Sequence, residues 1–388
     1  MKMRNKIKTY LKRNKILTNI KDFIRGFDYI LFFSAILLVI YGLILINSAI
    51  GLKEFSFNFD FSSFFYRQIL WSILGLIIFF ILLFFNYAWL KKFWWLVYII
   101  NLVGLIAVFI IGHVSHGARS WIGWRMLKIE PSEFFKIGII ITLAGFLSRK
   151  KEEDVNFFHL FITIFLAGLP IILIILQPDI GTAVIYIGIV IGILYLAGLR
   201  KIYLFTLFIL GLLSILIIIK FGYVEQYVLN RLLVFLNPNL DPYGIGYTLN
   251  QSIIAIGSGG LFGKGLFKGI QTALRFVPEP HTDFIFCILG EELGFVGAVI
   301  LISLYAIIIF RIIRVGITSK DKFGALICGG IATFLLLQFF INIGVTIGIM
   351  PITGLTLPLI SYGGSSLITT FFGLGLVESI YLRRFYTP

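Results

Sequence analysis

Long apolar runs follow one another along most of the chain and are separated by short polar stretches. About 20 consecutive apolar residues cross the hydrocarbon core of a bilayer, and several runs reach this length. The pattern therefore predicts an all-α polytopic membrane protein with about ten transmembrane helices. The fourth predicted helix is short for a span. The predicted spans are residues 29–50, 68–88, 93–112, 134–148, 157–176, 180–199, 202–220, 284–310, 323–348 and 361–381.

The composition agrees with this class of protein. Of the 388 residues, 59% are hydrophobic and 13% are charged, whereas soluble domains have about 45–50% and 25%. The first apolar run begins near Tyr29, too far along the chain for a signal peptide, so we expect a retained helix. Cys287 and Cys328 fall in predicted helices and indicate neither a disulfide framework nor a metal cluster. We expect a basic tail at residues 1–28 and a single membrane domain at 29–388.

The net charge of +15 follows the topology. Lys and Arg are concentrated in the N-terminal tail and in alternate loops, which places both termini in the cytoplasm. The positive charge then faces anionic membrane lipids, and no nucleic-acid partner is needed to explain it. The only long loop, residues 221–283, lies on the outer side between the seventh and eighth spans. Outer basic residues that topology does not explain, including Arg67, Arg119 and Lys264, suggest an anionic group on that face.

Three loop segments carry weaker signals. The stretch GSGGLFGKGLFKG (257–269) departs from the phosphate-loop pattern at Ser258 and Gly265, so it is a flexible turn or a headgroup contact through Lys264. In LQPDIGTAV, Asp179 can cap the following helix. The stretch GIMPITGLTLPLISYGGSS (348–366) puts two prolines and many small residues at membrane depth. It predicts a re-entrant segment lining something polar, with a plain outer loop as the alternative.

Charged residues also enter the predicted spans themselves. In GARSWIGWRMLKIEPSEFFK, Glu133 and Lys136 are spaced i, i+3 and share one helix face, while Trp121 fits an interface aromatic. A charged pair at the entrance to lipid should face a cavity.

In PEPHTDFIFCILGEELGFVGAVIL, Asp283 lies at the outer end of the eighth span. On a straight helix, Glu291 and Glu292 would lie roughly 12–14 Å deeper, facing the bundle interior for interhelical bonding or for function.

These groups suggest a reaction at the outer membrane surface. One carboxylate at the boundary, several cations and no nucleophilic Ser–His pair fit glycosyl transfer from a lipid diphosphate. The departing diphosphate needs positive charge and no acid, whereas the acceptor hydroxyl needs a general base. Composition alone does not distinguish this chemistry from lipid transport.

Four motifs together resemble the SEDS family of cell-shape, division and sporulation proteins. They are PEPHTDFIFCILGEELG, PITGLTLPLISYGGSS, QPDIGTA and GARSWI…EPSEFFK, in the family's order along nearly the whole chain. The resemblance implies a peptidoglycan glycosyltransferase that polymerises lipid II, inverting and non-hydrolytic, in the bacterial cytoplasmic membrane. It also implies a class B penicillin-binding protein as the transpeptidase partner. The stretch around residues 269–272 resembles the RodA branch and indicates cell elongation. A division or sporulation paralogue and a lipid II flippase are the alternatives.

The resemblance also implies roles for individual residues. Asp283 would be the catalytic carboxylate that deprotonates the acceptor sugar hydroxyl. Glu130 stands where the family usually has Gln, which leaves the role of that position open. A divalent cation, Mg²⁺ or Mn²⁺, is an optional cofactor in this scheme. The expected substrate-binding residues, of which the cations would offset the diphosphate charge, are Arg67, Arg119, Trp121, Glu133, Lys136, Asp179, Lys264, His281 and Ser361.

Overall fold

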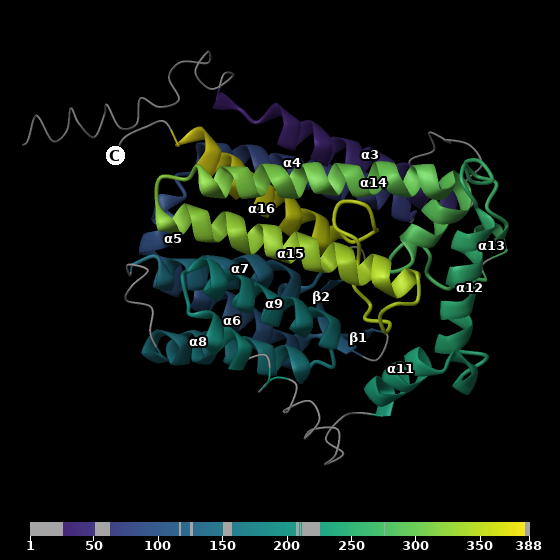
Figure 1. The fold of residues 1–388 in the computed structure, drawn as a ribbon, viewed down its shortest axis with the longest axis horizontal. Helices are drawn as coiled ribbons and strands as arrows, with labels where there is room; N and C mark the ends of the chain where they lie inside the picture. The colour runs from purple at the N-terminus through teal and green to yellow at the C-terminus, as the bar shows by residue number, and fades with distance from the viewer. Residues whose placement is uncertain are drawn as a thin grey trace, which may run out of the picture.

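The computed structural model describes residues 26–50, 63–115, 118–124, 127–149, 157–206, 209, 211, 226–274 and 276–384. Long helices lie side by side along one axis and form a bundle (Figure 1). The helices are α3 (Tyr29–Ile50), α4 (Phe64–Phe84), α5 (Ala88–Lys92), α6 (Trp94–Ile111), α7 (Pro131–Leu147), α8 (Phe157–Ile175), α9 (Ile180–Leu196), α11 (Gln226–Leu236), η3 (Pro238–Leu240), α12 (Ile245–Ser258), α13 (Ile270–Ala273), α14 (Ile285–Ile317), α15 (Lys322–Thr346) and α16 (Gly364–Leu382).

The predicted membrane spans correspond closely to these helices. Within the described ranges, seven helices are long and apolar enough to cross a membrane: α3, α4, α6, α8, α14, α15 and α16. Helices α7 and α9, with 17 residues each, match the fourth and sixth predicted spans. The predicted span at 202–220 falls largely outside the described residues.

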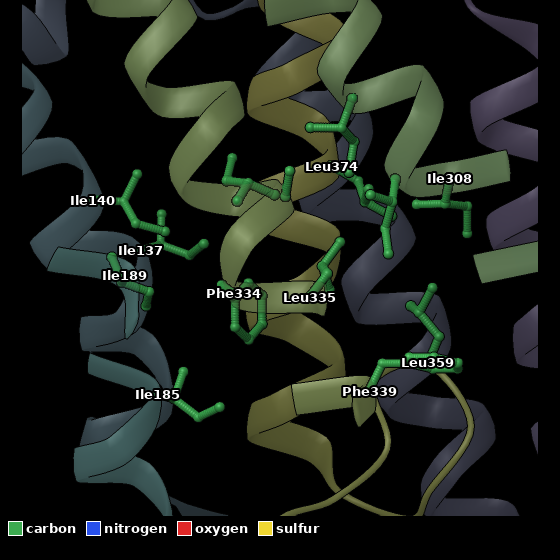
Figure 2. Packing of buried hydrophobic residues seen from close by; sticks show 14 of the residues in the cluster. Ile137, Ile140, Ile185, Ile189, Ile308, Phe334, Leu335, Phe339, Leu359 and Leu374 are labelled. Atoms are coloured by element: carbon green, nitrogen blue, oxygen red, sulfur yellow. The ribbon is translucent and has the colours of Figure 1, made fainter. Parts of the chain in front are cut away.

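Helix α7, the least obvious span in the sequence, lies at the centre of the bundle. Fourteen of its 17 residues are buried. Figure 2 shows Ile137 and Ile140 of α7 beside Ile185 and Ile189 of α9, with Phe334 of α15 facing them. Apolar side chains cover α7 on several sides, so its few polar groups are enclosed by protein and do not face lipid.

The start of α3 and the end of α16 meet at one end of the bundle. The Asp28 backbone N–H donates to Glu378 Oε1 at 2.9 Å, and Arg311 Nε and Nη2 donate to Asp28 Oδ2 at 2.9 and 2.5 Å. The strands and α11 to α13 lie at the opposite end (Figure 1). The first and last described helices of the chain therefore begin and end on the same side of the membrane, as the charge distribution predicted.

The outer end contains more regular structure than the sequence suggested. A small antiparallel sheet, β1 (His113–Ser115), β2 (Ala118–Trp124) and β3 (Leu127–Ile129), connects α6 to α7, so the all-α prediction missed these strands. The long outer loop folds into η3 and short helices, of which α12 packs on α14. Strands and helices this short leave little periodic signal in a sequence.

Candidate active site

Asp283 lies just before α14, at the outer end of the bundle, and is half-buried. Its backbone carbonyl accepts a hydrogen bond from Asn342 Nδ2 of α15 at 2.9 Å. Its carboxylate borders Gly354, where an added Cβ would lie 3.7 Å from Asp283 Oδ2. Gly354 has a φ of +75°, a conformation that favours glycine. The carboxylate therefore faces the segment that links α15 to α16.

This linking segment is tied to the backbone beside Asp283. The Tyr362 N–H donates to the His281 carbonyl at 2.8 Å, and Ser361 Oγ donates to the Thr282 carbonyl at 2.6 Å. Ser361 Oγ also accepts from the Leu357 N–H at 2.9 Å. Residues 351–357 are non-helical, as the re-entrant interpretation predicted; Leu355 and Leu357 are buried, Gly354 is exposed and the others are partly exposed. Ser361 is itself only 3% exposed and its hydroxyl bonds to backbone groups of both segments, while its contact with substrate stays a prediction.

An aromatic cluster joins His281 to Arg67. The His281 ring stacks on Phe64 with centroids 4.3 Å apart, and Tyr362 meets Phe64 edge-on at 4.9 Å. The Arg67 guanidinium carbon lies 5.9 Å from the Phe64 ring centroid. Burial lowers the pKa of His281, which the nearby Glu279 charge partly opposes. The imidazole is therefore neutral at neutral pH, whereas Arg67 brings a permanent positive charge to this side of the site.

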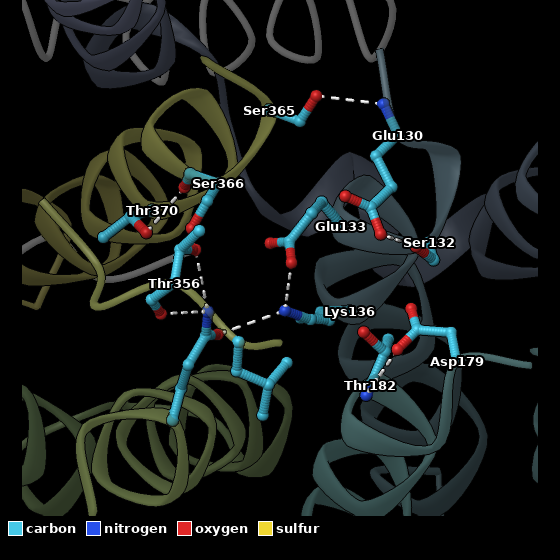
Figure 3. Close-up of polar contacts among 12 residues, drawn as sticks. Glu130, Ser132, Glu133, Lys136, Asp179, Thr182, Thr356, Ser365, Ser366 and Thr370 are labelled. Carbon is cyan, nitrogen blue, oxygen red and sulfur yellow. Dashed lines mark hydrogen bonds and ion pairs between the residues drawn. The ribbon is translucent and has the colours of Figure 1, made fainter. Parts of the chain in front are cut away.

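A second polar cluster surrounds Lys136, which is fully buried. Its Nζ lies 2.6 Å from Glu133 Oε1 and donates to Gln338 Oε1 at 3.1 Å. Figure 3 shows Glu130 and Glu133 at the start of α7 and Asp179 at the start of α9 around the same region. The predicted i, i+3 pair of Glu133 and Lys136 is thus present and enclosed by protein.

The two remaining carboxylates of this cluster have raised pKa values. Burial raises the pKa of Glu130, and the charges of Glu133 and Asp179 add to the effect. Burial also raises the pKa of Asp179, against the hydrogen bond that it accepts from the Thr182 N–H at 3.1 Å. That bond is the helix cap predicted for Asp179. Three carboxylates and one lysine therefore share a confined space, which favours protonation of the acids that lack a cation.

Helix α15 connects the two clusters. Gln338 Nε2 donates to the Thr356 carbonyl at 2.9 Å, while Gln338 Oε1 accepts from Lys136. One turn later, Asn342 Nδ2 donates to the Leu355 carbonyl at 2.7 Å and to Asp283. The linking segment is therefore held between Lys136 and Asp283. Gln338 and Asn342 were missed in the sequence, although two amides spaced i, i+4 in an apolar run were a usable signal.

The other predicted site residues lie elsewhere at the outer end. Trp121 of β2 pairs with His113 of β1 and is partly exposed, and Arg119 lies two residues earlier on the same strand. Lys264 forms an ion pair with Glu291, Nζ to Oε1 at 2.8 Å, and is therefore engaged within the protein. The structure does not bring Lys264 together with the Lys136 cluster through any hydrogen bond or ion pair among the described residues.

Glu291 and Glu292 are fully buried, and Glu292 accepts from Ser48 of α3, which confirms the expected interior position with bonding between helices. The assumption of one straight helix was wrong, because Gly294 breaks α14 with a φ of 61° and a ψ of −157°. Both carboxylates precede this break, and the Glu291 and Glu292 carbonyls accept from the outer-loop N–H groups of Lys264 and Gly265. They therefore lie against the outer loop and do not lie along the long span.

The described residues offer no ready-made protein site for a metal. They include no group of three or more His, Cys, Asp or Glu side chains arranged to hold one. The optional divalent cation stays a prediction.

Comparison with known proteins points to one family. The profile of a family described as "Cell cycle protein" (FtsW, RodA, SpoVE) matches residues 28–385. Stage V sporulation protein E of Bacillus subtilis is 37% identical over 358 residues, covering 91% of this chain and 96% of that protein. Peptidoglycan glycosyltransferase MrdB of Escherichia coli K12 is 39% identical over 289 residues, covering 74% and 77%. A chain in a peptidoglycan synthase complex, solved in a study of how polymerization and crosslinking are coordinated, superimposes with a TM-score of 0.80 at 31% identity. The match covers 93% of this chain and 99% of that one.

Proposed function

Because the chain belongs to the FtsW, RodA and SpoVE family of multi-pass bacterial membrane proteins, we propose that it polymerises lipid II into glycan strands. The activity is that of a peptidoglycan glycosyltransferase, the name carried by its relative MrdB. The reaction takes place on the outer face of the cytoplasmic membrane, where Asp283 and the linking segment lie. Cell elongation is the proposed role. The relatives include a stage V sporulation protein and an FtsW protein at similar identities, so a sporulation or division paralogue is the alternative.

The position of Asp283 is the observation that carries this proposal. Its backbone is fixed by Asn342, and its half-buried carboxylate borders the segment around Gly354. In the proposed reaction, Asp283 takes the proton of the acceptor sugar 4-hydroxyl. The resulting oxygen attacks the anomeric carbon of the growing strand with inversion, and the bond from that carbon to the lipid diphosphate breaks. General base catalysis of this kind contributes about 10²- to 10⁴-fold to a rate.

Arg67 is the better placed cation for the departing diphosphate. It lies over Phe64, whose ring stacks with His281, two residues from Asp283. Lys136 is fully buried and already paired with Glu133. Its contribution is therefore to hold Gln338, which in turn holds the linking segment beside Asp283. In this proposal Arg67 contacts the diphosphate, whereas Lys136, which the sequence predicted for the same contact, acts through Gln338.

Polymerisation of lipid II by the purified protein tests the assignment. The variant Asp283→Asn preserves the shape of the side chain and removes the base, so we expect the polymerisation rate to fall about 100-fold or more. The matched control is Asp241→Asn, because Asp241 Oδ2 accepts from the Ile245 N–H at 2.8 Å and so caps α12 on the outer loop. A polymerisation rate for Asp283→Asn equal to the parent rate would exclude Asp283 as the base.

A lipid II flippase was the alternative from another functional class. It depended on Glu291 and Glu292 at mid-depth in the bilayer, whereas Glu291 accepts from Lys264 and from the Gln271 N–H of the outer loop, which supports the enzyme. Liposome assays separate the two functions, because lipid crossing without polymer would indicate a transporter.

A crosslinking partner is part of the proposed function. The similar chain of known structure comes from a peptidoglycan synthase complex that coordinates polymerization and crosslinking, which supports a penicillin-binding protein partner here. We propose a class B enzyme that supplies the transpeptidase. Copurification of the two proteins, with the polymerisation rate measured with and without the partner, tests this pairing.

A further inference from the structure

The break in α14 lies close to Asp283 in the sequence. Gly294 divides the helix into a short segment, residues 285–293, and a long span, residues 295–317. The short segment begins two residues after Asp283 and is buried except for Leu293. Its orientation therefore decides where the Asp283 carboxylate lies.

The outer loop at residues 260–265 satisfies both sides of the break. The N–H groups of Lys264 and Gly265 donate to the carbonyls of Glu291 and Glu292, each at 3.0 Å. On the other side, the N–H groups of Phe295 and Val296 donate to the carbonyls of Gly260 and Leu261 at 2.9 and 3.1 Å. Unpaired backbone groups away from water cost several kcal/mol each. The hydrogen bonds to the loop therefore offset the cost of the break in α14 and fix the angle between its two segments.

Two buried carboxylates strengthen this contact. Glu291 Oε1 accepts from Lys264 Nζ at 2.8 Å and from the Gln271 N–H at 2.9 Å. Glu292 Oε1 accepts a short hydrogen bond from Ser48 Oγ of α3. Both glutamates are fully buried, so neither is there for solubility. One ties the short segment to the outer loop, and the other ties it to the first span.

We infer that Glu291 and Lys264 are positioning residues, which hold the short segment of α14 so that Asp283 points at its substrate. The inference rests on the proposed function, because it assumes that Asp283 is the base. A buried ion pair by itself is weak evidence for stability, whereas orientation has a large effect on rate. A misplacement of about 1 Å can cost about 100-fold in rate.

Four variants test this role: Glu291→Ala, Glu291→Gln, Lys264→Met and Lys268→Met. Glu291→Ala removes the acceptor for both donors, and Lys264→Met removes the charged donor without touching the buried acid. We expect both to lower kcat for lipid II polymerisation by about 10- to 100-fold with KM nearly unchanged. Glu291→Gln keeps an acceptor oxygen and should recover most of kcat. Lys268 is exposed on the same loop, so Lys268→Met is the matched control and should keep the parent kcat.

A second readout does not depend on activity. Amide hydrogen exchange across residues 281–289 should become faster in Lys264→Met than in the parent and in Lys268→Met. Unchanged exchange together with an unchanged kcat would overturn the inference, as would a rise in KM alone, which would make Lys264 a substrate contact. If Glu291→Ala fails to fold, the kcat and the hydrogen exchange of Lys264→Met decide between the two outcomes. If the parent protein makes no polymer, the proposed function fails. Faster exchange in Lys264→Met would then still show that Lys264 and Glu291 hold the short segment of α14.

Discussion

Gln338 and Asn342 lie one turn apart on α15 and hold neighbouring carbonyls of the same segment. Gln338 donates to the Thr356 carbonyl at 2.9 Å, and Asn342 donates to the Leu355 carbonyl at 2.7 Å. The same two amides also contact Lys136 and the backbone of Asp283. A change at Lys136 should therefore alter the linking segment beside Asp283, and a change near Asp283 should alter the surroundings of Lys136.

The variant Asn342→Leu should damage both stability and activity. Leucine has a similar size but donates no hydrogen bond, so the carbonyls of Asp283 and Leu355 lose their shared donor. An unsatisfied buried polar group costs about 1–3 kcal/mol. Thermal unfolding in detergent and lipid II polymerisation measure the two effects. The control is Asn101→Leu, because Asn101 donates to Val97 within its own helix; equal effects at both positions would contradict the prediction.

The buried pair of Glu133 and Lys136 should separate stability from activity. Lys136→Met leaves Glu133 without its cation, and breaking a buried pair costs about 3–5 kcal/mol. The double variant Glu133→Gln, Lys136→Met removes both charges, so most of this stability should return. Polymerisation should stay low in both, because methionine donates nothing to Gln338. The prediction fails if the double variant unfolds at the same temperature as the single variant.

The stability of the protein should depend on pH through Glu130. Burial raises the pKa of Glu130, so the folded protein keeps a proton that the unfolded chain loses above pH about 4.3. The folded state then binds more protons, and stability falls as pH rises from that value through the raised pKa. Glu130→Gln cannot ionise, so its unfolding temperature should fall less than that of the parent as pH rises above about 4.3. Parallel pH profiles for parent and variant would show that Glu130 ionises normally.

Gly354 should not tolerate a side chain. Gly354→Ala forces an L-residue into a left-handed conformation, at a cost of roughly 1–2 kcal/mol. Its Cβ would also lie beside the Asp283 carboxylate. We expect a lower kcat together with a lower unfolding temperature. The control is Gly257→Ala on α12, where an added Cβ meets nothing within 4 Å; a parental kcat for Gly354→Ala would refute the prediction.

The sequence by itself determined the membrane class, the positions of the spans that fall on described residues and the pairing of Glu133 with Lys136. Each of these depends on a local cost. A polar residue in lipid is unfavourable wherever it occurs, so the apolar runs mark the spans. Residues spaced i, i+3 on a helix are neighbours whatever surrounds the helix.

Only the tertiary structure decided which distant groups meet. Asp283, Asn342 and Gly354 come from separate segments, and nothing in their local sequence encodes the contact. The break at Gly294 is a second case, because a glycine in an apolar run is compatible with a continuous helix. The break forms because the outer loop docks there and satisfies the freed N–H and carbonyl groups. Hydrogen bonding between segments far apart in the chain thus fixed the geometry that hydrophobic patterning left open.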